Sequence, residues 1–146
     1  MSQKNPISNF IPADDEVLAF LSNFSEKWRT SSDGAEFIEQ NFTFIGSKPV
    51  LRNLKCYKTA EYKNFADIKK FLSSDPSIKS KILSGEISYI GDNLTSAEVK
   101  FTPEYFYDFL KFVVENIPEH HYFCNPKIGW ILFIAMEGYV EFGVLH

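Results

Sequence analysis

The residues best suited to covalent chemistry lie near the C-terminus, where Cys124 follows His121 by three positions. A thiol becomes a useful nucleophile when a base lies within hydrogen-bond reach. The surrounding residues favour a strand, in which side chains three positions apart point to opposite faces. We therefore expect no catalytic dyad, but a buried, reduced Cys124 beside an exposed histidine pair, His120 and His121.

The same region holds the residue types that bind zinc. The candidate ligands are His120, His121, His146 and Glu119. No spacing among them fixes a third ligand, and the glycine-rich sequences that hold nucleotide phosphates do not occur in the chain. Two carboxylate pairs near predicted strand ends are expected to be solvated: Glu137 with Glu141, and Glu98 with Glu86. The sequence thus predicts no catalytic residue, no metal site and no cofactor.

These residues belong to a chain of 146 residues, the usual size of one domain. Hydrophobic residues make up 45% of it and include fifteen Phe, enough to build one core. Residues 1–12 lack the apolar stretch of a secretory signal, and the longest apolar run, residues 130–136, is too short to cross a bilayer. We expect a cytoplasmic protein without a membrane-spanning segment, with an irregular arm (1–12) and one domain (13–146).

Helical signals recur along the chain. Acidic residues 14–16 begin a first helix that ends before residue 30 and presents an apolar face of Val17, Leu21, Phe24 and Trp28. Further helices are predicted at residues 35–40, 65–72 and 76–85, the first capped by Asp33 and the last by Asp75. The clearest helix follows Thr102 as its N-cap. Its predicted buried face consists of Phe106, Phe109, Leu110, Val113 and Ile117.

Strand signals lie between and after these helices. A short strand is predicted at residues 42–45, an edge strand at 51–57, and a hairpin from 86–90 and 94–101 with its turn at 91–93. The C-terminus has the pattern of a β-meander over residues 121–124, 130–136 and 139–145. Residues 130–136 are apolar on both faces, as in a central strand covered by helices. The predicted fold is α+β: an antiparallel sheet, formed by the meander and the hairpin, with several helices packed on it.

Charge is distributed unevenly along the sequence. Residues 42–85 hold nine bases and three acids, a net charge of +6, whereas residues 1–41 carry −4 and residues 86–146 carry −6. If these segments occupy different faces, the molecule has opposed surface potentials; if they interleave, the charges cancel. The lysine-rich segment 48–81 also contains tyrosine and phenylalanine, a composition that suits single-stranded nucleic acid. Scarce arginine and an acidic chain disfavour nucleic acid as the partner.

Two classes of function fit a chain without catalytic motifs. A protein-binding domain needs a surface with aromatic anchors and charge, which this composition supplies. A small-ligand-binding domain would need an aromatic-lined pocket between sheet and helices, with convergent polar groups that the sequence does not locate. We expect a non-enzymatic protein-binding domain, with the small-ligand pocket as the alternative.

The C-terminal meander has a specific sequence, His121-Tyr122-Phe123, Trp130-Ile131-Leu132-Phe133 and Glu137-Gly138-Tyr139-Val140-Glu141-Phe142-Gly143. It resembles the closing meander of small bacterial immunity proteins encoded beside polymorphic toxins. The resemblance covers residues 119–145 and carries over no functional residue. It implies a cytoplasmic, non-enzymatic inhibitor that binds one cognate toxin.

An immunity protein facing a basic toxin would use its acidic C-terminal third. The candidate exposed acids are Glu98, Glu119, Glu137 and Glu141, and the candidate aromatic anchors are Tyr122 and Tyr139. Glu137 and Glu141 are the first choices because turn and outer-strand positions are accessible.

Overall fold

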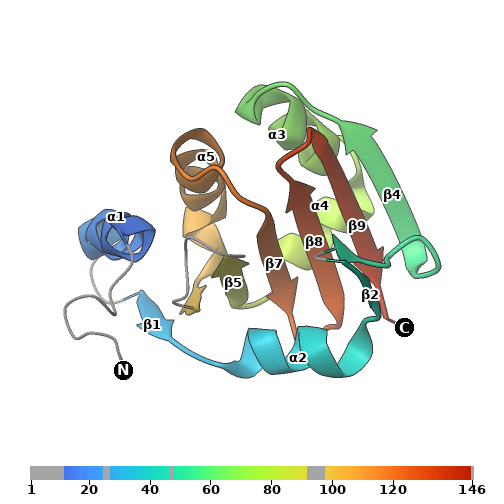
Figure 1. The fold of residues 1–146 in the computed structure, drawn as a ribbon, viewed down its shortest axis with the longest axis horizontal. Helices are drawn as coiled ribbons and strands as arrows, with labels where there is room; N and C mark the ends of the chain where they lie inside the picture. The colour runs from blue at the N-terminus through green and yellow to red at the C-terminus, as the bar shows by residue number, and fades with distance from the viewer. Residues whose placement is uncertain (1–11, 25–26, 47, 92–97, 146) are drawn as a thin grey trace.

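The computed structural model describes residues 12–24, 27–46, 48–91 and 98–145, with the backbone alone at 12–14 and 24. Its largest feature is a seven-stranded sheet in the order β1-β6-β5-β7-β8-β9-β4, in which every neighbouring pair is antiparallel. Helices cover both faces (Figure 1). The predicted α+β class with an antiparallel sheet is confirmed.

The C-terminal strands follow the predicted meander. β7 (His121–Asn125), β8 (Trp130–Ala135) and β9 (Tyr139–Val144) pair in sequence order. All six residues of β8 are buried between β7 and β9, as an apolar run predicts. The middle position of the sheet, which we predicted for this run, belongs to β7. Met136 is 57% exposed because β8 ends at Ala135 and the chain turns there.

The predicted hairpin is also present, since β5 (Ile87–Gly91) pairs with β6 (Val99–Phe101). Its turn, predicted at residues 91–93, lies outside the described residues beyond Gly91. β5 then pairs with β7 on its other side, which joins the hairpin to the meander. Most of the predicted strand 94–101 falls on residues the structure does not describe.

The first predicted helix is wrong at its C-terminal end. α1 (Pro12–Leu21) is followed by a short 3-10 turn, η2 (Ser22–Phe24), and then by edge strand β1 (Trp28–Thr30). Trp28 pairs with Phe101 of β6, so a long-range strand contact overrides the helical spacing. Residues 1–11 of the predicted arm lie outside the described residues, and Pro12 already belongs to α1.

The middle of the chain forms the other edge of the sheet. After α2 (Asp33–Asn41) come a two-stranded hairpin, β2 (Phe44–Ile45) with β3 (Lys48–Pro49), and edge strand β4 (Lys55–Glu61). The edge strand was predicted at residues 51–57 and is displaced along the chain. Residues 51–54 instead form a turn, in which the Leu54 N–H donates to the Leu51 carbonyl at 2.9 Å and Leu51 is buried.

Helices α3 (Phe65–Ser73) and α4 (Pro76–Ile82) begin at the predicted residues, and α4 ends at Ile82, three residues before the predicted end. The Asp75 carboxylate accepts hydrogen bonds from the N–H groups of Ser77 and Ile78, so the predicted cap is confirmed. The predicted side-chain cap at Asp33 is absent, because Asp33 is the first residue of α2 and its carboxylate binds Lys100.

The last helix has the predicted buried face and a different N-terminus. A 3-10 turn, η3 (Pro103–Tyr105), precedes α5 (Phe106–Asn116). The Thr102 hydroxyl contacts the Glu104 carboxylate at 3.2 Å and caps no helix N–H, so that prediction is wrong. The predicted apolar residues are all buried: Phe106, Phe109, Leu110, Val113 and Ile117. No described helix is long and apolar enough to cross a bilayer.

Two apolar clusters hold the layers together, one on each face of the sheet. Helices α1, α3, α4 and α5 cover one face, where aromatic rings meet edge to face, as between Tyr89 and Phe109 at 5.0 Å. α2 and residues 42–54 cover the other face, packing against Ile131, Phe133 and Cys124. Burial on both faces of the interior strands provides the main stabilisation of the fold.

Candidate functional site

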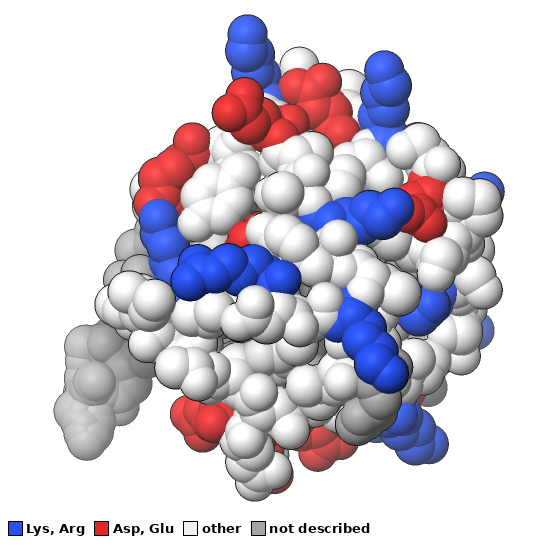
Figure 2. All heavy atoms as spheres, turned by 90° about the vertical axis from the view of Figure 1, so that its right-hand side faces the viewer, with Lys and Arg blue, Asp and Glu red and all other residues white. Residues whose placement is uncertain are grey.

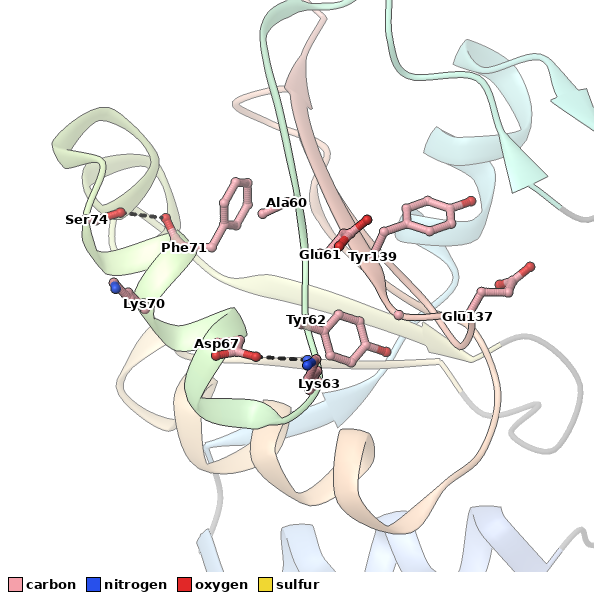
Figure 3. A pocket seen from close by; sticks show the side chains of 11 residues that line it. Ala60, Glu61, Tyr62, Lys63, Asp67, Lys70, Phe71, Ser74, Glu137 and Tyr139 are labelled. Carbon is pink, nitrogen blue, oxygen red and sulfur yellow. Dashed lines mark hydrogen bonds between the residues drawn. The ribbon is translucent and has the colours of Figure 1, made fainter.

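A surface groove of about 940 Å³ lies along the outer part of β4. In Figure 3, β4 runs between side chains of α3 on one side and those of the β8–β9 turn and β9 on the other. Its lining combines aromatic rings with charged groups of both signs. The lining residues are Ala60, Glu61, Tyr62, Lys63, Asp67, Lys70, Phe71, Ser74, Glu137, Gly138 and Tyr139.

The α3 wall of the groove is fixed by local hydrogen bonds at the helix N-terminus. The Asn64 side chain accepts from the Asp67 N–H at 3.1 Å, and the Asp67 carboxylate accepts from the Lys63 N–H at 2.9 Å (Figure 3). This pair of hydrogen bonds closes the N-terminus of α3, whose N-cap residue is Asn64. It places the first turn of α3 directly after β4, so Lys63 and Lys70 face solvent beside the strand.

The opposite wall of the groove, at the β8–β9 turn, is connected to β4 by two hydrogen bonds of Tyr62. Its N–H donates to the Gly138 carbonyl at 2.9 Å, and its hydroxyl donates to the Ala135 carbonyl at 2.7 Å. Burial raises the pKa of this phenol. Gly138 has φ of +102°, which favours glycine, and a Cβ there would lie 3.2 Å from the Tyr62 carbonyl oxygen. The turn therefore has a defined position relative to the strand.

Charge at the groove is only partly compensated inside the molecule. Glu137 pairs with Lys48, whose hydrogen bond holds the pKa of the carboxyl below its usual range. The Lys48 ammonium also lies 5.4 Å from the centre of the Tyr139 ring. Lys63 and Lys70 form no ion pair with any described residue. The groove thus presents two lysines and two acids, Glu61 and Asp67, that form no ion pair with a described residue, beside the neutralised Glu137.

This arrangement suits binding. The Ser74 hydroxyl donates to the Phe71 carbonyl at 3.3 Å, so it is engaged with the backbone. The described lining contains no histidine or cysteine that could act as a base or nucleophile. Aromatic rings and lysines are groups that contact a partner surface or an acidic chain.

Two of the predicted partner-binding residues, Glu137 and Tyr139, line this groove. The third predicted residue of the same region, Glu141, lies on the neighbouring strand β9 and is half-buried. It accepts a hydrogen bond of 2.5 Å from the Tyr57 hydroxyl. Burial is the main cause that raises the pKa of the Tyr57 hydroxyl to about 12, and the hydrogen bond to the Glu141 carboxylate raises it further. Glu137 and Glu141 are thus engaged with the lysine-rich segment and do not form an open acidic patch.

The prediction that Glu98 is exposed is wrong. Its carboxylate is buried and accepts hydrogen bonds from the N–H groups of Gly34 at 2.7 Å and Ala35 at 3.0 Å. It therefore serves as the N-terminal cap that α2 lacks locally, since Ser32 makes no side-chain cap. Burial raises the pKa of Glu98 despite these hydrogen bonds. A Cβ at Gly34 would lie 2.7 Å from the Ser88 Cβ, so only glycine fits this approach.

Glu119 and Tyr122 are also buried, against the prediction of an exposed acid and an accessible anchor. The Tyr122 ring packs against Phe133 with centroids 5.2 Å apart, inside the cluster under α2. Glu119 lies in the short connection from α5 to β7, where residues 119–125 are all buried. We expected Glu119 among the exposed acids, whereas this residue is only 5% exposed.

The histidine pair is buried as well, which corrects the expected exposure. The His121 Nε2 lies 3.0 Å from the Ile117 carbonyl and must donate to it, so Nδ1 accepts from the Tyr89 hydroxyl at 2.7 Å. Burial lowers the pKa of His121 to about 4. The His120 Nδ1 accepts from the Met136 N–H at 3.1 Å, so its 3.8 Å approach to Glu137 is not an ion pair in this arrangement.

His121 and Cys124 lie on opposite faces of β7, as predicted. Burial strongly raises the pKa of the Cys124 thiol, which keeps it protonated and inert. Cys56 is exposed, and both cysteines are free thiols. Within the described part of the chain, His, Cys, Asp and Glu side chains form no group of three that could hold a metal ion.

The predicted partner-binding residues did not include the groove residues of the lysine-rich segment: Tyr62, Lys63, Lys70 and Phe71. The signal that could have found them was the net charge of +6 over residues 42–85. This segment forms β2, β3, β4, α3 and α4, which lie together at one end of the molecule (Figure 1). On that face, Lys and Arg side chains cross the middle and most acids lie nearer the rim (Figure 2).

Comparison with known proteins gives no assignment. No protein-family model matches the chain, and no curated protein matches it.

Proposed function

We propose that this chain is a non-enzymatic, cytoplasmic protein-binding domain whose contact surface is the β4 groove. The observation that carries the proposal is the meeting, in one groove, of lysines without an ion pair, half-buried aromatic rings and the outer edge of the described sheet. Aromatic anchors supply most of the energy of a typical interface, and charged rims guide association. These properties occur together along β4.

The small-ligand alternative receives less support. The aromatic side chains between the sheet and its main helix layer pack against one another, as Phe109 does with Tyr89 and Phe101 at 5.0 and 5.1 Å. They fill the layer in which the small-ligand alternative places its pocket. The β4 groove is open and rimmed by charge, whereas small-molecule sites are typically enclosed and apolar.

The immunity role is one specific form of this proposal. What supports it is the resemblance of the C-terminal meander, in which the Glu137–Gly138 turn and Tyr139 line the groove. Of the acids that we expected at the contact surface, Glu98 and Glu119 are buried and Glu137 pairs with Lys48, whereas Lys63 and Lys70 form no ion pair with a described residue. The toxin, if it is the partner, should therefore contact this end of the domain through acidic residues.

Affinity capture from the native host tests the function. The tagged chain should retain one stoichiometric protein partner after nuclease treatment of the lysate. The double variant Lys63→Glu/Lys70→Glu should lose that partner or release it much faster. Lys127→Glu is the matched control, because Lys127 is an exposed lysine on the β7–β8 turn, at the opposite end of the strands from the β8–β9 turn.

If the captured partner binds the Lys63→Glu/Lys70→Glu variant as well as it binds the wild-type chain, the contact surface must lie elsewhere on the domain. Retention of nucleic acid alone, lost on nuclease treatment, would contradict a protein-binding role. Identification of a secreted toxin domain as the partner, with protection of cells that express it, would support the immunity role.

A further inference from the structure

We propose that the free edge of β4 binds an extended acidic segment of the partner, which adds to the sheet as an eighth strand. This inference deepens the proposed protein-binding function and rests on it. β4 is the last strand of the sheet, and among the described residues only β9 pairs with it. Addition of a strand to a free edge is a common mode of peptide recognition, in which backbone hydrogen bonds give affinity.

The backbone of β4 has groups directed away from β9. The register pairs Thr59 with Glu141 and Glu61 with Tyr139, and the next residue, Tyr62, donates its N–H to Gly138. In an antiparallel pair, residues alternate between facing the partner strand and facing away from it. The N–H and C=O groups of Thr59 and Glu61 therefore point outward, where an added strand would meet them.

The groove extends across this edge. Ala60, Tyr62 and Phe71 belong to the apolar cluster on the α3 side of the sheet, whereas Tyr139 belongs to the cluster on the α2 side. In Figure 3, Ala60 and Phe71 lie on one side of β4 and Tyr139 lies on the other. An extended chain laid along the edge would direct alternate side chains toward the two groups. This is the pattern by which strand addition acquires sequence preference.

The charges around β4 favour an acidic segment as the strand that binds at its free edge. Residues 55–70 hold five lysines and two acids: Lys55, Lys58, Lys63, Lys69 and Lys70 against Glu61 and Asp67. Among described residues only Lys58 of these lysines forms an ion pair, with Asp75 at 2.9 Å. An acidic strand would meet this excess positive charge favourably.

The same charges argue against a second copy of this chain at the edge. Lysines on an edge strand protect it from pairing with its own kind, because two such edges repel. They do not exclude a strand of opposite charge. The seven residues of β4 are also long enough to guide pairing, whereas β1 at the other edge has three.

The test uses a synthetic, fluorescently labelled peptide of about eight residues that alternates Glu with Thr, titrated with the full chain at low salt. We expect saturable binding that weakens as salt rises. The same peptide with Lys in place of Glu should not bind. The same peptide N-methylated at every second residue cannot donate backbone hydrogen bonds along one of its edges, so it should bind at least about tenfold more weakly.

Variants of β4 separate backbone pairing from charge. Thr59→Pro removes an outward N–H and no backbone hydrogen bond to β9, although it also removes the hydrogen bond from the Thr59 hydroxyl to the Val140 carbonyl. It should lower affinity by about tenfold or more. Thr59→Val removes the same hydroxyl contact with the Val140 carbonyl but keeps the N–H, and is the matched control. Glu61→Gln removes an acid from the edge and should tighten binding.

Absence of binding by the acidic peptide, or equal binding by its N-methylated form, would overturn the inference even if Thr59→Pro failed to fold. Equal binding by Thr59→Pro and Thr59→Val would also overturn it. A concentration-dependent dimer that Thr59→Pro abolishes would assign the edge to a second copy. If the native partner is retained by Thr59→Pro but lost by Lys63→Glu/Lys70→Glu, strand addition fails while the proposed function stands.

Discussion

Strands β8 and β4 have similar lengths and opposite surroundings. Every one of the six residues of β8 is buried, and none of the seven residues of β4 is. β8 contains no charged residue, whereas β4 carries Lys55, Lys58 and Glu61. Both belong to one sheet, separated by β9 alone.

The difference indicates a division of roles across the sheet. An interior strand covered on both faces contributes mainly to folding, because its side chains leave water completely. A charged edge strand contributes little burial and leaves backbone and lysine groups accessible. Substitutions in β8 should therefore change stability, and substitutions along β4 should change binding.

The largest expected effect comes from Phe133→Ala in β8. Phe133 is fully buried and packs against Tyr122 at 5.2 Å and His120 at 5.3 Å between ring centres. Loss of the ring should lower the free energy of unfolding by about 3–5 kcal/mol, through lost transfer energy and a cavity. Urea titration followed by circular dichroism measures it. An unchanged midpoint would contradict the division of roles.

The second prediction compares a buried acid with an exposed one. Glu98→Ala leaves the N–H groups of Gly34 and Ala35 without their acceptor and should cost about 1.5–3 kcal/mol. Glu61→Ala on the exposed edge should change the free energy of unfolding by less than about 0.5 kcal/mol. Thermal melts of both variants test this ordering. Equal losses would show that the edge acid also supports the fold.

The third prediction concerns pH. The folded-state pKa of His121 is lowered to about 4, below the ordinary value of 6.5, so the unfolded chain takes up a proton first as pH falls. The stabilisation from neutral His121 is present above pH 6.5 and is lost between pH 6.5 and 4, about 2 kcal/mol of it by pH 5.

Comparison of the wild-type chain with His121→Phe isolates this contribution, because the other titrating groups are common to both. The difference in unfolding free energy between pH 7 and pH 5 should be smaller in the variant by about 2 kcal/mol. Parallel pH profiles for the two proteins would mean that His121 does not remain neutral in the fold.

The smallest expected effect is the change in the free energy of unfolding when the lysines beside β4 are replaced. Lys63→Glu/Lys70→Glu should change the free energy of unfolding by less than about 0.5 kcal/mol, because neither lysine forms an ion pair with a described residue. Its effect should appear in partner association and its salt dependence. A loss above 1 kcal/mol, a magnitude typical of structural substitutions, would weaken the contrast between β4 and β8.

The sequence by itself determined the elements whose signals are local. The Asp75 cap with Pro76 at the first helical position located α4, the apolar spacing located the buried face of α5, and the run at residues 130–136 identified an interior strand. Capping, helical periodicity and a continuous apolar run each involve neighbouring residues. They keep their meaning in any tertiary setting.

The tertiary structure decided whatever depended on distant partners. Trp28 lies in a strand because β1 pairs with the edge of β6. Glu98 is a buried cap because the N-terminus of α2 lies beside the start of β6. The acids expected to form a binding surface were buried or paired, while Lys63 and Lys70 stayed free beside β4. Exposure depends on what packs against a residue, and contacts between distant segments are absent from a linear pattern.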